Sequence, residues 1–362
     1  MSCSICLLPF TPAPGSTCPR PPPRGILDTK QYTYFQYAIG LGSRIGGVVS
    51  PFEYLDGNNF RNTSSNLMIM MCVWESSGGT DFMCHAACAK MVRHALGMEG
   101  DDFETLVEIA GLEKVLGRPM GGAKAGWLPD IRYKELGTPH VDMAKYWETG
   151  DEPGGNMFRW KAFKDDGFEW MFNRPDMFPK FKGVSEKRKK SIGEPKQPTS
   201  DIITTQPLDV IQILLPYLST PSYMALTSTC RILRKYALCE FQPEARRRVL
   251  ELGWAVPLRS EYEKNASKAF MASARIEESP VDADWLLYLC HVHKTAAMRM
   301  RRRVWEISQG IARVWKAKRP MSVIADTVGE NGELVKSAER RKLESSVQQS
   351  LLMSQMLPPL GG

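Results

Sequence analysis

The stretch from Pro207 to Leu238 reads PLDVIQILLPYLSTPSYMALTSTCRILRKYAL, and its apolar spacing decides the fold of the second half of the chain. Apolar residues recur there at the steps of three and four that are typical of helices, at Ile211, Leu214, Leu215, Leu218, Tyr223, Leu226, Cys230, Leu233 and Tyr236. Pro221 marks a stop and a restart, because proline ends one helix and is tolerated in the first turn of the next. About thirty residues cannot bury a large core alone. This unit must therefore share its apolar surface with the rest of the chain or with a partner.

The same stretch resembles the F-box in both of its halves. In the first half, the proline, acidic residue, Ile-Leu pair and closing leucine of that family are matched in order by Pro207, Asp209, Leu214 with Leu215, and Leu218. In the second half, a Pro/Ser turn, an apolar helix position and a Cys-Arg pair are matched by Thr220–Ser222, Leu226 and Cys230 with Arg231. Two residues depart from the family pattern: Gln206 replaces a leucine, and Pro216 falls inside the predicted first helix.

The resemblance, which is to F-box proteins abundant in fungi, implies a partner and a role. The chain would bind a Skp-type adaptor, and through it a cullin scaffold, as the substrate-recruiting subunit of an SCF-type ubiquitin ligase in ubiquitin-dependent degradation. Its contribution would be to raise the effective concentration of a protein substrate, whose identity the sequence does not indicate. The resemblance implies an apolar adaptor-binding surface drawn from Pro207, Leu208, Ile211, Leu214, Leu215, Leu218 and Leu226. Some of these residues must instead pack against the following helices.

Composition places the chain among intracellular globular proteins. Its 362 residues are 43% apolar and 24% charged, and the net charge of +7 is too small to require a nucleic-acid partner. Nine irregularly spaced cysteines do not form a disulfide pattern. There is no basic, apolar leader and no run of about 18 apolar residues, so we expect neither a signal peptide nor a membrane span. We expect the protein in the cytoplasm, the nucleus or both.

The chain divides into regions of different pattern, which together predict an α+β fold. Residues 1–181 form a mixed, loop-rich α/β-containing domain, with strands expected at Gln31–Ala38 and Asn66–Trp74 and helices at Phe82–Leu96 and Phe103–Leu116. Residues 182–201 read as a basic linker, 202–240 as the F-box-like module and 241–320 as a mainly α-helical region. Residues 321–362 are polar, and we expect them to be partly disordered, with a weak helix at Glu333–Met356. The aromatic-rich segment Trp127–Phe181 is the expected recognition surface.

A cysteine and histidine pattern near the N-terminus is a candidate metal site. Cys3 and Cys6 form a C-x-x-C pair, and Cys84, His85 and Cys88 follow some eighty residues later. Two thiolates in a tight turn can occupy two corners of a tetrahedral zinc site, and either His85 with Cys88 or Cys84 with Cys88, at i and i+4 of a predicted helix, could supply the others. The gap is far longer than the roughly 12–20 residues usual between the halves of a zinc site.

The pattern also resembles the region ahead of the F-box in many fungal F-box proteins, where Cys3, Cys6, His85 and Cys88 match and Cys84 replaces an aromatic residue. That likeness does not define a chemistry. Thiols without a cofactor are the main interpretation, and a structural zinc ion held by these four residues is the alternative.

Other signals favour neither catalysis nor nucleic-acid binding. No nucleophile motif, metalloprotease motif or phosphate-binding loop is present, so we expect no enzyme activity. The basic run Lys187–Lys190 suits a solvated linker better than a nuclear import signal. Basic residues between Arg299 and Arg319, with Trp305 and Trp315, could contact a phosphate backbone, or they could be the solvent side of an amphipathic helix. A helical nucleic-acid-binding protein, or a zinc-stabilised scaffold without a ubiquitin role, is the alternative function.

Overall fold

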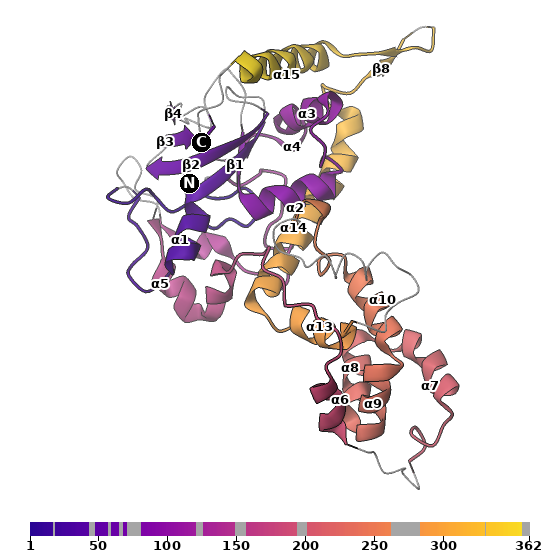
Figure 1. Ribbon diagram of the computed structural model, residues 1–362. Helices are drawn as coiled ribbons and strands as arrows, with labels where there is room; N and C mark the ends of the chain where they lie inside the picture. Colours follow the sequence, from indigo (N-terminus) through magenta and orange to yellow (C-terminus); the bar gives the residue numbers. More distant parts are fainter. Residues whose placement is uncertain are drawn as a thin grey trace. The chain divides into compact units, whose positions relative to one another are not determined.

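The computed structural model of the chain contains a mixed unit and a helical unit. It describes residues 1–16, 19–42, 48–56, 59–64, 68–70, 81–120, 126–148, 157–193, 201–261, 283–329 and 331–356. One compact unit, called the N-terminal unit below, comprises residues 1–174 with 302–362, and the other, the helical unit, comprises residues 175–301 (Figure 1). The predicted α+β class with a mainly helical C-terminal half is confirmed. No helix in the described ranges is both long and apolar enough to cross a membrane.

An antiparallel sheet forms the core of the N-terminal unit (Figure 1). Its strand order is β4-β3-β2-β1-β5, and its strands are β1 (Tyr37–Leu41), β2 (Val49–Asp56), β3 (Asn59–Asn62), β4 (Met68–Met70) and β5 (Phe82–His85). Strand β1 pairs with β2 on one side and with β5 on the other. In β2, Phe52 and Tyr54 alternate inward and are fully buried, as a half-buried strand requires. Of the predicted strand Asn66–Trp74, β4 lies within the described residues, and the rest lies outside them.

The strand predicted at Gln31–Ala38 is wrong, because a helix occupies most of it. Helix α1 (Thr29–Gln36) begins at a capping box in which Asp28 accepts from the Gln31 backbone and Gln31 accepts from the Asp28 backbone. The two hydrogen bonds satisfy backbone donors that the first turn of a helix leaves free. The strand β1 starts only at Tyr37.

The helix predicted at Phe82–Leu96 begins later than expected. Phe82–His85 is the buried strand β5, and helix α2 (Ala86–Leu96) follows directly, so Cys84 and Cys88 do not share a helix face. A short apolar run that is buried on both sides has no periodicity that separates strand from helix. The helix predicted at Phe103–Leu116 is two helices, α3 (Phe103–Ala110) and α4 (Leu112–Leu116), which are separated at Gly111.

The aromatic segment after Trp127 is core rather than the expected recognition surface. It contains the short elements η2 (Met143–Tyr146), β6 (Trp147–Glu148), β7 (Met157–Phe158), α5 (Trp160–Phe163), η3 (Lys164–Phe168) and η4 (Glu169–Phe172). Their rings contact one another, and the buried ones include Trp147, Phe158, Trp160, Phe163, Trp170 and Phe172. Burial of these large rings explains why a segment with so little regular structure is ordered.

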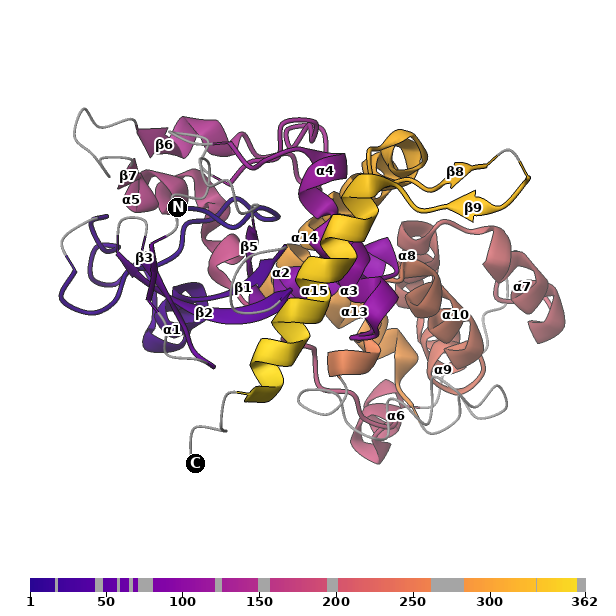
Figure 2. The same ribbon diagram turned by 90° about the horizontal axis from the view of Figure 1, so that it is seen from above.

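The C-terminal part of the chain also belongs to the N-terminal unit. Helix α14 (Ala296–Lys318) lies in the region predicted to be helical. It is followed by η7 (Arg319–Met321), strands β8 (Thr327–Val328) and β9 (Leu334–Val335) and helix α15 (Ala338–Met356). Helix α15 lies along α3 (Figure 2), where Arg340 contacts Glu104 and Glu108. Leu343 and Val347, one turn apart on α15, are buried, so much of the segment predicted as a polar tail is packed.

The helical unit confirms the predicted run of helices. It contains α6 (Glu186–Ile192), α7 (Leu208–Leu214), η5 (Leu215–Tyr217), α8 (Thr220–Thr229), α9 (Arg231–Cys239), α10 (Gln242–Leu252), η6 (Arg259–Glu261) and α13 (Trp285–Val292). Helix α6 lies within the segment predicted as a linker, where Ile192 is buried and Arg188 pairs with Asp284. Pro216 does not break a helix, because α7 ends at Leu214 and the proline lies in the first turn of η5.

Candidate functional site

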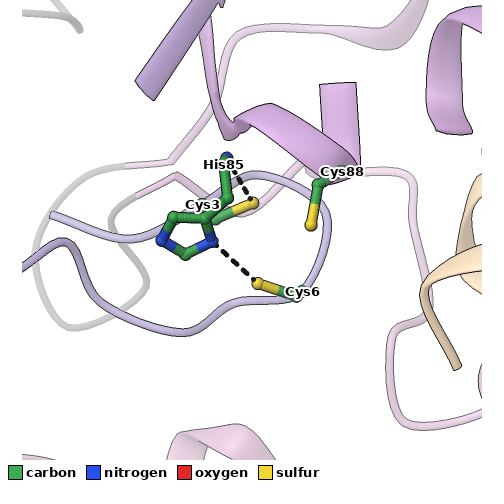
Figure 3. A group of neighbouring side chains, drawn as sticks. All are labelled: Cys3, Cys6, His85 and Cys88. Atoms are coloured by element: carbon green, nitrogen blue, oxygen red, sulfur yellow. Dashed lines mark hydrogen bonds between the residues drawn. The ribbon is translucent and has the colours of Figure 1, made fainter. Parts of the chain in front are cut away.

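Four side chains in the N-terminal unit converge into a buried cluster that could hold a metal ion. The ligand atoms of Cys3, Cys6, His85 and Cys88 all lie within 4.8 Å of one another. The four side chains gather around one point (Figure 3), and each of the four residues is fully buried. The His85 Nδ1 atom lies 3.3 Å from the Cys6 Sγ atom, and the His85 backbone N–H donates to the Cys3 Sγ atom at 3.4 Å. The structure thus brings together all four residues of the predicted metal site.

The two N-terminal thiols are presented by a tight turn. Leu7 N–H donates to the Cys3 carbonyl oxygen at 3.0 Å, and Cys3 N–H donates to the Leu8 carbonyl oxygen at 2.9 Å. Leu7 has φ of 64°, a left-handed conformation that is uncommon for a residue other than glycine. The turn attaches to the sheet through Ser4 N–H, which donates to the Met83 carbonyl oxygen at 2.9 Å. The sheet therefore fixes the position of the C-x-x-C pair, although about eighty residues separate the two segments.

The junction between β5 and α2 presents the other two ligands. His85 is the last residue of β5 and the N-cap of α2, and Cys88 lies in the first turn of that helix. The helix N-terminus favours negative charge at this position, but burial and the neighbouring thiols raise the pKa of Cys88. The His85 ring lies among Phe10, Tyr34 and Phe35, with ring centroids 4.7, 5.4 and 4.9 Å away. These rings hold the imidazole with Nδ1 toward the thiols.

The thiols of the cluster influence one another strongly. Burial acts to raise the pKa of Cys3, but hydrogen bonds from Cys6, Cys84 and Cys88 bring that pKa well below its usual value. Burial and the neighbouring Cys3 raise the pKa of Cys6, Cys84 and Cys88 well above the usual value. Without a cation, one negative charge on the cluster therefore opposes a second. A bound metal ion removes this opposition, because it favours the thiolate form of every ligand.

Cys84 adds a further buried thiol beside the cluster, but it is not one of the four donors that converge. It lies in β5, opposite Ile39 of β1, and it interacts with Cys3. Of the two ligand pairings that the sequence left open, the geometry brings together His85 with Cys88. Cys18 and Cys72 lie outside the described residues.

Burial separates the predicted adaptor-binding residues into two groups. Ile211 and Leu215 are 2% exposed and pack inside the helical unit, whereas Leu214 is 53% exposed. Pro207 is exposed, and the remaining three are half-buried, namely Leu208, Leu218 and Leu226. Sequence spacing alone could not make this separation, because both groups fall on positions three or four residues apart.

Three apolar residues beside this set were missed. Val210, Ile213 and Tyr217 are 37%, 65% and 83% exposed, and with Leu214 they form an exposed apolar stripe along α7 and η5. Their spacing of three and four is a second helical stripe that could have been found in the sequence. Exposed apolar side chains that gather on one short element are typical of an interaction site.

A buried arginine holds the end of this stripe in place. The Nη2 atom of Arg248 on α10 donates to the carbonyl oxygens of Leu215 and Leu218 at 2.7 and 2.8 Å. Its guanidinium lies 4.7 Å from the ring centroid of Tyr223 on α8. The Leu215 carbonyl also accepts from Leu218 N–H at 3.1 Å, so Arg248 adds a second donor at the end of η5. Arg248 also pairs with Glu244, one turn earlier on α10, and that i,i+4 spacing is the one sequence signal that could have pointed to it.

The basic residues between Arg299 and Arg319, on α14 and η7, do not form one basic surface. Arg301 and Arg303 are 0% exposed, Lys318 pairs with Asp130, and Arg319 pairs with Glu108. Among the residues of the basic run Lys187–Lys190, Arg188 is paired with Asp284, and all four lie in helix α6.

Comparison with known proteins gave no relative of this chain. No protein-family model, no curated protein and no solved structure matches it.

Proposed function

We propose that the Cys3, Cys6, His85 and Cys88 cluster holds a structural zinc ion. The observation that supports this is the convergence of three thiols and one imidazole within 4.8 Å in a fully buried site. Structural zinc sites use four protein ligands with sulfur or nitrogen donor atoms. Catalytic zinc sites use three protein ligands and leave the fourth position to water or substrate. The ion would join the N-terminal turn to the β5–α2 junction and so close the N-terminal unit.

The test is the zinc content of the purified full-length chain by native mass spectrometry. We expect one zinc per chain, lost in Cys3→Ser with Cys88→Ser and in His85→Ala. Cys239→Ser removes an exposed thiol away from the cluster and should leave the zinc content unchanged. Cys84→Ser should also retain zinc, because that thiol is not among the four donors. Folded wild-type protein without zinc, or full zinc in the double variant, would refute the proposal.

We further propose that the helical unit binds a Skp-type adaptor and that the chain recruits a protein substrate to a cullin-based ubiquitin ligase. The observation that favours this is the exposed stripe Val210, Ile213, Leu214 and Tyr217, which lies on the element that resembles the first F-box helix. Arg248 fixes that element to α10, so the stripe is presented on a positioned surface. Burial of apolar side chains in a partner groove supplies the binding free energy of such an interface.

The test is co-expression of the full-length chain with a fungal Skp-type adaptor, followed by size-exclusion chromatography. A one-to-one complex is expected, and Leu214→Asp with Tyr217→Asp should abolish it while the fold is kept, because both side chains are exposed. The matched control is Val328→Asp with Leu334→Asp, two equally exposed apolar residues of the β8–β9 hairpin. An intact complex with the first pair, or no complex with folded wild-type protein, would contradict the assignment.

A further inference from the structure

One edge of the aromatic core in the N-terminal unit is a row of three rings, called the aromatic row below. Trp147 of β6 and Phe158 of β7 are directly opposite residues of an antiparallel pair, and their ring centroids lie 5.3 Å apart. The Phe158 ring is also 5.0 Å from that of Trp160, the first residue of α5. Next to this pair, Arg159 N–H donates to the Tyr146 carbonyl oxygen at 2.8 Å. Backbone pairing as well as ring contact therefore holds the row in place.

The aromatic row is supported from below by the rings that surround His85. The Trp160 ring centroid lies 6.4 Å from that of Phe35, and Phe35 lies 4.9 Å from His85. Phe10, whose ring is 4.7 Å from His85, lines one small cavity together with all three rings of the row. An apolar surface that is already ordered binds a ligand without the entropic cost of ordering itself.

A proline-rich segment of the same chain, residues 19–24 with the sequence PRPPPR, covers the row. Pro19 and Pro22 are half-buried, and with the three rings they line a cavity of only about 20 Å³. The other four residues of the segment are exposed, namely Arg20, Pro21, Pro23 and Arg24. A polyproline II helix has three residues per turn, so positions i and i+3 share one face. The burial of Pro19 and Pro22 is the pattern of such a helix with one face on the rings.

The groove continues beyond the covered rings. An open cavity of about 530 Å³ is lined by Phe158 and Trp160 and, on the other side, by Pro21 and Pro23. Charged side chains of both signs also line it, namely Arg20, Glu148, Arg159, Lys161 and Asp165. This mixed charge favours neither an acidic nor a basic ligand, so the rings define the chemistry of the groove.

Apolar contact alone holds the segment on the row. Among the described residues, no hydrogen bond or ion pair joins residues 19–24 to a distant part of the chain, and Ile26 N–H, which donates to the Pro23 carbonyl oxygen, belongs to the adjoining turn. Trp147 is 8% exposed, and its Nε1 atom has no acceptor within the described ranges. Buried indole N–H groups usually have an acceptor. The carbonyl groups of a polyproline II helix make no internal hydrogen bonds, so a ligand of this kind could supply one.

We propose that the aromatic row is a polyproline II-binding site, which residues 19–24 cover until a proline-rich segment of a partner protein replaces them. Aromatic grooves bind such segments because the polyproline II helix is already ordered and loses little entropy on binding. A partner segment that reaches the Trp147 indole gains a hydrogen bond that the covering segment lacks. The open cavity beside the row gives it further apolar surface to bury. This inference is independent of the zinc and adaptor proposals.

The test compares the full-length wild type with the full-length variant Pro19→Ser with Pro22→Ser, which removes the two half-buried prolines of the covering segment. The probe is a fluorescein-labelled decaproline peptide, and its binding is measured by fluorescence anisotropy. The wild type should bind it about 10-fold more weakly than the variant, because a tethered segment at millimolar effective concentration competes with a ligand whose Kd is about 100 μM. The matched control is Pro14→Ser with Pro129→Ser, two exposed prolines that line neither cavity, and it should behave as the wild type.

A second measurement keeps the covering segment intact. In ¹⁵N-labelled wild type, decaproline at saturating concentration should shift the Trp147 indole N–H resonance, because that donor gains an acceptor. Trp147→Phe keeps an aromatic ring, removes the donor and assigns the resonance. Combined with Pro19→Ser and Pro22→Ser, it should weaken peptide binding by about 5-fold, the effect of one hydrogen bond.

Four results would overturn the inference. The first is a folded Pro19→Ser with Pro22→Ser variant that does not bind decaproline, and the second is equal affinity of this variant and the wild type. The third is binding without a shift of the Trp147 resonance, which would place the peptide elsewhere. The fourth is a wild-type dimer in size-exclusion chromatography that the double variant does not form, since the occupant would then be the same segment of a second copy.

Discussion

The N-terminal unit is closed by groups far apart in the sequence, whereas helices α7 to α10 of the helical unit pack against near neighbours in the sequence. In the first, Cys6 meets His85 across 79 positions and Arg340 meets Glu104 across 236. In the second, Arg248 holds the Leu215 carbonyl across 33 positions. A contact between residues close in the sequence costs little loop-closure entropy. A contact between distant residues costs more, and a strong interaction must offset that cost. The comparison indicates that only the N-terminal unit should depend on a metal ion.

Two buried arginines on α14 differ in the groups that they contact. Arg301 in the helical unit makes two hydrogen bonds to the Glu261 carboxylate, at 2.8 and 2.9 Å. Arg303 in the N-terminal unit is equally buried, and its hydrogen bonds within the described residues go to backbone carbonyl oxygens. Each unit must neutralise one buried cation, and a carboxylate does so in the helical unit.

The largest expected effect is that of Cys88→Ser on the N-terminal unit. A structural zinc ion contributes roughly 10 kcal/mol or more of binding free energy, which is folding free energy when no site preforms. We expect the thermal transition of the N-terminal unit to disappear and that of the helical unit to persist in differential scanning calorimetry. Two unchanged transitions would show that the cluster does not hold this unit together.

A smaller effect, confined to the helical unit, is expected for Glu261→Gln. The change leaves Arg301 as an uncompensated buried cation, which costs about 3–5 kcal/mol. Urea unfolding should show the helical unit weakened by that amount, with zinc content unaffected. Glu251→Gln, which changes an exposed carboxylate of the same unit, serves as the control. Zinc loss in Glu261→Gln would mean that the two units are not energetically separate.

The smallest effect concerns the docking of α15 on α3. Burial acts to raise the pKa of Glu108, but the guanidinium groups of Arg319 and Arg340 hold it below its usual value. A carboxyl group with a lowered pKa stabilises the fold above its unfolded pKa of about 4.3, and that contribution is lost as the pH falls through the folded pKa. Glu108→Gln should cost about 1 kcal/mol at pH 7, because the site is partly exposed. The difference from wild type in chemical denaturation should shrink below about pH 4, and a constant difference would contradict this account.

The apolar spacing in the sequence predicted the helices of the helical unit well, because α7 to α10 follow one another along the chain. The spacing of Ile211, Leu214 and Leu215 predicted helix α7. Burial on α7 depends on which side meets the other helices, and that is a tertiary property. Ile213 and Tyr217 follow helical spacing, but spacing alone does not say that their side of the helix is the exposed one.

The N-terminal half was harder to predict, because its elements depend on distant partners. The residue types indicated the ligand set of Cys3, Cys6, His85 and Cys88. The helix predicted over Phe82–His85 was wrong, because pairing with β1 makes that segment a strand. The capping box at Asp28 was a local signal that could have predicted α1. Nothing in the sequence pointed to Arg303, since its burial arises from a loop that is more than 160 residues away.

The most direct test of this account is hydrogen–deuterium exchange of the full-length chain with zinc and after chelation. Chelation should remove amide protection from β5 and the first turns of α2, around residues 81–92, while α8 to α10, residues 220–252, keep theirs. Identical exchange with and without zinc, or equal loss of protection in both segments, would contradict the claim that a metal ion closes the N-terminal unit alone.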